Sequence, residues 1–140
     1  MAQNTSPVYS RVPRCDFNSY LTAVNTTADL TAGTIYLVFT ADATNGSYVS
    51  HIRFKATPAG NTTTTVARIW LNNGSSTGTA TNNILFDEVD LPQTNSSATG
   101  ATMGVAKNYE LRLPASWRIY ITLGTGSTNG WACSVLGGDY

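Results

Sequence analysis

Residues that could act in catalysis are few in this chain and do not form a recognisable motif. His51 is the only histidine, and strand alternation places its side chain on the same face as those of Arg53 and Lys55. Nucleophilic catalysis needs a nucleophile, a base and a third group that orients the base. No G-x-S-x-G sequence or equivalent accompanies His51. We therefore interpret His51 as a surface histidine and predict that the protein is not an enzyme.

The acidic run Asp87-Glu88-Val-Asp90, with three carboxylates in four residues, is the most distinctive group of polar residues in the sequence. In a strand, Glu88 and Asp90 project to one face and Asp87 to the other. Two carboxylates on one face could share a proton or bind Ca²⁺. We favour the alternative that the carboxylates lie on the solvent face or form cross-strand pairs with an arginine, either Arg68, Arg112 or Arg118.

Two glycine-containing loops resemble ligand sites only in part. The segment 42–47 lacks the ligand spacing and the terminal glutamate of an EF-hand, so we predict a turn in which Asn45 and Gly46 supply positive φ angles. The segment 124–130 lacks the lysine and the following helix of a phosphate loop, so we predict a hairpin. We expect no cofactor and no metal site.

The two cysteines, Cys15 and Cys133, stand near opposite ends of the chain. They could close one long-loop disulfide, which would constrain the unfolded state. The other interpretation, which we favour, is two free thiols, with Cys133 inside a core strand.

Aromatic side chains provide a further test for a binding site. Trp70, Tyr120 and Tyr36 fall on strand faces opposite the main core positions, and exposed aromatics mark sugar or protein contacts. Strands that are buried on both faces also hold aromatics, and we favour that interpretation. Trp70 and Tyr120 are nevertheless retained as candidate interface residues.

Composition narrows the classes of partner. The chain has 140 residues, 11% charged residues and a formal net charge of zero. Nucleic-acid binding needs a clustered positive field, and the basic residues here are scattered, so we expect neither nucleic acid nor membrane as a partner. The first residues lack the basic and apolar regions of a signal peptide, so we expect synthesis in the cytoplasm.

Strand signals recur at intervals along the chain, and amphipathic helical spacing is absent. The predicted strands cover residues 34–40, 47–57, 62–72, 83–91, 107–113, 117–124 and 130–136. We predict that the first is a central strand covered on both faces, and that residues 58–61 join the second and third in a hairpin. The fold class is therefore all-β, an antiparallel β-sandwich of seven to eight strands that is jelly-roll-like.

The N-terminal segment differs from the rest because Pro7 and Pro13 favour extended chain. We predict an extended arm over residues 1–16, or an edge strand, that packs on its own domain or reaches a neighbour. Residues 17–140 form the single sandwich domain. The candidate interface residues of the arm are Pro7, Tyr9, Arg11 and Arg14.

Six short blocks carry a family resemblance: SHIRFKATP (50–58), ARIWLNNG (67–74), LFDE (85–88), LRLP (111–114), RIYIT (118–122) and GGDY (137–140). Together they span about two-thirds of the chain. In these blocks the chain resembles the small head-decoration (cement) proteins of tailed bacteriophages. The resemblance implies a sandwich made in the host cytoplasm that binds the major capsid protein on the virion exterior, often as a homotrimer.

Three functions follow as alternatives. The first is a decoration protein that stabilises a capsid. The second is a carbohydrate- or receptor-binding module of a phage fibre or tail, which would use exposed aromatics such as Trp70 and Tyr120 over a polar groove. The third is a shell subunit that assembles by itself.

Overall fold

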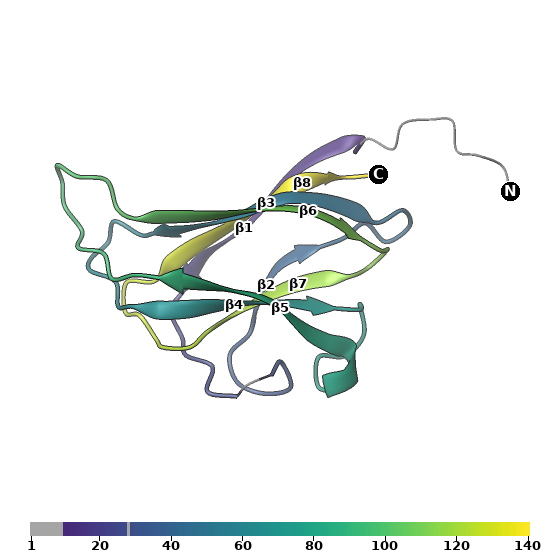
Figure 1. Ribbon diagram of the computed structural model, residues 1–140, viewed down its shortest axis with the longest axis horizontal. Coiled ribbons are helices and arrows are strands. Elements are labelled where there is room, and N and C mark those ends of the chain that lie inside the picture. The colour runs from purple at the N-terminus through teal and green to yellow at the C-terminus, as the bar shows by residue number, and fades with distance from the viewer. Residues whose placement is uncertain (1–9, 28) are drawn as a thin grey trace, which may run out of the picture.

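The computed structural model describes residues 10–27 and 29–140 (Figure 1). Their regular structure comprises β1 (Val12–Leu21), β2 (Tyr36–Thr40), β3 (Ser47–Ala56), β4 (Thr65–Asn72), the 3₁₀ helix η1 (Ala80–Asn82), β5 (Asn83–Leu91), β6 (Gly104–Leu113), β7 (Arg118–Leu123) and β8 (Trp131–Asp139). Within these ranges no helix has the length and apolar content needed to cross a bilayer. The prediction of an all-β fold is confirmed.

The strands form two antiparallel sheets that pack face to face (Figure 1). Sheet A has the order β1-β8-β3-β6, and sheet B has the order β2-β7-β4-β5. Pairing is nested, because β4 pairs with β5 and the pairs β3·β6, β2·β7 and β1·β8 lie successively outside it. Nested pairing across two sheets is the jelly-roll arrangement, so that expectation is confirmed as well.

Strand β3 shows how the sequence builds the core. Ile52, Phe54 and Ala56 are fully buried and alternate with the more exposed Arg53 and Lys55. Period-two alternation sends one set of side chains between the sheets and the other set outward. Burial of a large apolar side chain contributes about 2–3 kcal/mol, so the inner faces of both sheets hold the sandwich together.

Two predicted hairpins are wrong. Strand β3 belongs to sheet A and β4 to sheet B, so residues 57–64 cross between the sheets. The glycine-rich segment 124–130 likewise crosses from β7 in sheet B to β8 in sheet A. In this jelly roll only β4 and β5 are consecutive strands of one sheet. A short polar connection signals a change of direction, but it does not say which sheet receives the next strand.

The prediction that residues 34–40 form a central strand is also wrong. Strand β2 is an edge strand of sheet B that pairs only with β7. Its apolar residues differ in burial: Phe39 lies in the core, whereas Leu37 is exposed. The register shift between Leu37 and Phe39 turns successive side chains of this edge strand to different sides. This explains how an edge strand can hold a continuous apolar run.

A second, smaller core lies on the outer face of sheet B. Leu30 from the long β1–β2 connection packs with Trp70 of β4 and Tyr120 of β7. The indole Nε1 of Trp70 donates a hydrogen bond to Thr122 Oγ1 at 3.0 Å. Asn25 supports the connection by donating to the carbonyl oxygens of residues 32 and 34. The connection thus covers part of a sheet face that would otherwise be wet.

Strand β1 begins inside the segment predicted to be an arm. Residues 12–16 pair with β8, so this part of the chain is an edge strand of its own domain. The boundary predicted after residue 16 falls within a strand. Pro7 and Tyr9 lie outside the described residues.

Candidate functional site

Strand β1 turns polar side chains inward and apolar ones outward. Arg14, Asp16 and Asn18 are half-buried, whereas Cys15 and Phe17 are exposed. Phe17 keeps 73% of its surface accessible, which is the largest value among the exposed large apolar side chains of the described residues. The backbone ladder with β8 and polar contacts must therefore hold most of this strand in place.

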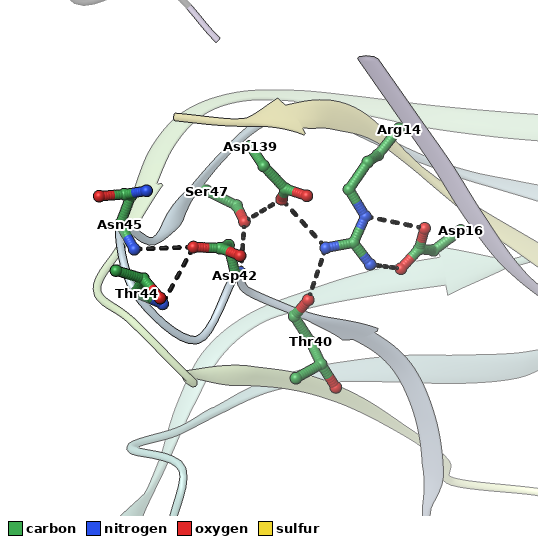
Figure 2. Close-up of polar contacts among 8 residues, drawn as sticks. All are labelled: Arg14, Asp16, Thr40, Asp42, Thr44, Asn45, Ser47 and Asp139. Atoms are coloured by element: carbon green, nitrogen blue, oxygen red, sulfur yellow. Dashed lines mark hydrogen bonds and ion pairs between the residues drawn. The ribbon is translucent and has the colours of Figure 1, made fainter. Parts of the chain in front are cut away.

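Arg14 makes the main polar contacts of β1 (Figure 2). Its Nη1 donates to Asp139 Oδ1 at 3.0 Å and to the Thr40 carbonyl oxygen at 2.7 Å. Its Nε and Nη2 donate to the carboxylate of Asp16. The guanidinium carbon lies 4.4 Å from the centre of the Phe39 ring, a cation–π distance. One side chain thus joins β1, β2 and β8 across the two sheets.

A hydrogen-bonded turn continues this cluster (Figure 2). Ser47 donates its hydroxyl to Asp139 and accepts the backbone N–H of Asp42 at 2.9 Å. Asp42 Oδ1 accepts the backbone N–H groups of Thr44 at 2.9 Å and Asn45 at 2.7 Å. The predicted turn over 42–47 is therefore confirmed, although only Gly46, at φ 77°, has a positive φ there.

Electrostatics favour the charged forms of Arg14 and Asp42. Burial alone would lower the pKa of Arg14, but hydrogen bonds to Asp139 and Asp16 outweigh it and raise the pKa. Backbone hydrogen bonds from Asn45 and Thr44 lower the pKa of Asp42. Each carboxylate is directed at a donor, and the described residues contain no group of three or more His, Cys, Asp or Glu side chains placed to hold a metal. The cluster is built to fasten strands together.

The acidic run on β5 also forms specific contacts. Glu88 accepts from Arg68 Nε at 2.9 Å, which confirms the predicted cross-strand pair. Asp87 accepts the hydroxyl of Tyr109 on β6 at 2.6 Å, and this bond lowers the pKa of Asp87. The ring of Phe86 lies 5.3 Å from that of Tyr109. These contacts join β5 to β6 at the edge of the sandwich opposite β1 and β2.

The single histidine lies where strand alternation placed it. His51 is half-exposed on β3, and its Nδ1 is 3.1 Å from the hydroxyl of Ser50. That hydroxyl also donates to the carbonyl oxygen of Leu136 at 2.9 Å, so it serves the sheet.

The cysteines are free thiols, as favoured from the sequence. Cys15 is exposed and Cys133 is fully buried. Burial raises the pKa of Cys133 to about 12.

Two of the predicted interface residues need correction. Trp70 and Tyr120 are buried at 5% and 8% exposure, because the β1–β2 connection covers them. They offer no stacking surface to a sugar, and their interpretation as core aromatics is confirmed. Arg14 is engaged within its own domain. Arg11 is exposed, and its backbone N–H donates to the Asp139 carbonyl oxygen at 2.6 Å.

Sequence reasoning missed the surface residues that the structure exposes most. Six of the nine exposed large apolar side chains among the described residues lie on the edge strands β1 and β5: Val12, Phe17, Tyr20, Ile84, Leu85 and Phe86. Three consecutive apolar residues in β5 cannot all face the core of a sandwich, so a signal for that group was present. Phe17 lay outside the predicted strands, and its exposure follows from the register of β1 against β8.

Comparisons with family models, curated proteins and solved structures gave no match. The exposed edge strands are therefore the observations from which a function can be argued.

Proposed function

We propose that the protein is a structural virion protein that binds the outer surface of a bacteriophage capsid and stabilises it, as a decoration or cement protein does. The observation that carries the proposal is the collection of exposed apolar side chains on β1 and β5, the edge strands at opposite sides of the sandwich. Exposed apolar patches mark protein contacts. Exposed apolar side chains at both edges allow one domain to bridge two neighbours.

The partner in this proposal is the major capsid protein, and the location is the virion exterior. Each contact is modest, because an interface of standard size needs about 800 Å² per partner. Many equivalent contacts on one shell add through multivalency, which suits a protein without strong charge. The resemblance of residues 48–140 to decoration proteins supports the same role and adds the expectation of a homotrimer.

Co-sedimentation with capsids assembled without the protein tests the proposal. We expect saturable binding at a stoichiometry related to the symmetry of the shell, and capsids that resist heat better once loaded. Changing Phe17 to Ser should weaken binding, whereas Ser19→Ala on the same strand is the matched control. Removing residues 1–9, which leaves every described strand intact, tests the contribution of the predicted arm. Failure of the wild-type protein to sediment with capsids would refute the proposal.

A shell subunit that assembles by itself is the second candidate, and the jelly-roll strand order favours it because viral capsid subunits use this arrangement. Fold alone does not assign function. Electron microscopy of the purified protein separates the two candidates, because closed particles in the absence of other proteins would identify a shell subunit.

A further inference from the structure

The outer face of sheet A combines an aromatic side chain with unpaired cations. Phe17 of β1 lies opposite Ser134 of β8, which in turn lies opposite Arg53 of β3. Strands are about 4.8 Å apart, so Phe17 and Arg53 stand about 10 Å apart in one row across the sheet. The small Ser134 between them leaves both side chains accessible. In the same face, Ala132 of β8 lies opposite Lys55.

The face is more basic than acidic: Glu110 of β6, two residues from Arg112, is an exposed carboxylate on it, against the cations of Arg53, Lys55 and Arg112. Arg53 and Arg112 are exposed, and neither they nor Lys55 forms an ion pair within residues 10–27 and 29–140. Lys55 donates to the carbonyl oxygen of Thr102. A hollow lined in part by Lys55, Ala132 and the loop around Gly100 adjoins the row. A ligand for this face must supply apolar atoms beside Phe17 and carboxylates beside the cations.

Strand β5 of the same protein has that chemistry. Ile84, Leu85 and Phe86 are exposed at 61%, 42% and 39%. They are followed along the strand by two exposed carboxylates: Glu88, which pairs with Arg68, and Asp90, which has no ion pair among the described residues. Among residues 10–27 and 29–140, β4 is the only strand that pairs with β5 in sheet B, so β5 is an edge strand. Apolar and acidic groups are thus presented together on an accessible strand.

We propose that the outer face of sheet A binds strand β5 of a second copy of the protein. Charge complementarity selects this occupant, since the basic face and the acidic strand would each repel a copy of themselves. Because the two surfaces are different, the contact is heterologous and joins copies head to tail.

Sedimentation velocity with two charge reversals tests the pairing. Arg53→Glu reverses a charge on the outer face of sheet A, and Asp90→Lys reverses a charge on β5. Each variant alone should therefore associate at least tenfold more weakly than the wild type. A mixture of the two variants retains one intact face and one intact strand. Association should therefore recover in the mixture. It should also recover in the double variant Arg53→Glu/Asp90→Lys, because the reversed charges of its face and strand attract each other. Arg118→Glu on sheet B is the control for charge reversal, and thermal melting verifies that every variant is folded.

The outcomes separate clearly. A wild-type protein that stays monomeric at all concentrations overturns the inference. So does association that both single variants retain, because another surface would then carry the contact. Failure of the mixture to restore association also overturns the inference, because the intact face and the intact strand would then not be partners. The inference concerns contacts between copies and does not require capsid binding. It uses the same β1 and β5 side chains as the proposed capsid contact, so a given strand serves one partner or the other. A monomer that still co-sediments with capsids would overturn it and leave the decoration role standing, and an oligomer that ignores capsids would do the reverse.

Discussion

The Arg14 cluster makes the most direct test of how β1 is held. Replacing Arg14 by Met keeps an unbranched apolar stem over Phe39 and removes the charge. The change deletes two ion pairs, one hydrogen bond to the Thr40 carbonyl oxygen and one cation–π contact. Arg11→Met, on the same segment but exposed and without an ion pair among the described residues, is the matched control.

The expected loss in the free energy of unfolding follows from how deeply Arg14 and its partners are buried. The Arg14 side chain is 22% exposed, and its partners Asp16 and Asp139 are 29% and 20% exposed, so each pair lies between a surface pair and a buried one. Each pair then contributes about 1 kcal/mol, and the remaining two contacts together contribute about 1 kcal/mol. We expect a loss of about 3 kcal/mol for Arg14→Met, which corresponds to roughly 10 °C in Tm for a domain of this size.

Urea unfolding and amide hydrogen exchange are the assays. Because Leu21 is the only fully buried residue of β1, Arg14→Met should accelerate exchange in β1 more than in β3. The control Arg11→Met should change the free energy of unfolding by less than about 0.5 kcal/mol. Equal effects of the two variants, or uniform exchange across both sheets, would refute the role given to the cluster.

Three further predictions concern the core and its titrating groups. Thr122→Val leaves the buried indole N–H of Trp70 without an acceptor and should cost about 1–3 kcal/mol in urea unfolding; the exposed Thr128→Val should cost almost nothing. The pKa of Asp87 is lowered in the fold, so its stabilisation is present above its unfolded pKa of about 3.9 and is lost as pH falls through the folded value. Asp87→Asn should therefore lose less stability than the wild type between neutral and acid pH; an identical acid slope would contradict this. A disulfide-exchange reagent at mildly alkaline pH should modify one thiol rapidly, that of Cys15, and none in Cys15→Ser unless the protein unfolds.

The sequence predicted the positions of the strands better than it predicted which strands pair with one another. Alternation in residues 47–57 and the boundaries of 83–91 were sufficient to place β3 and β5, because burial on one face leaves a period of two. Which sheet receives each strand depends on the global nesting of pairs. That nesting has no local signal, so the two hairpins were misassigned and β2 was placed in the centre instead of at an edge.

The same limit applies to the candidate site. Trp70 and Tyr120 were correctly favoured as core residues, yet their cover comes from Leu30, many positions away in sequence. The inward turn of Arg14 depends on Asp139 at the other end of the chain. Contacts of this kind become visible only when the register of β1 against β8 is known. Phe17 is exposed for the same reason, since that register puts it on the outer face.

Nested pairing also implies an order in which the strand pairs form during folding. The β4–β5 pair closes over residues 73–82, whereas the β1–β8 pair joins residue 12 to residue 139. Loop-closure entropy grows with the length of chain to be closed, and distant contacts are made late unless inner ones have already brought them near. We expect φ-values to be highest for variants in β4 and β5 and close to zero for variants in β1. The outer face of sheet A that carries Phe17 is then completed in the last step of folding. A chain that is still folding therefore does not yet offer this face to another molecule.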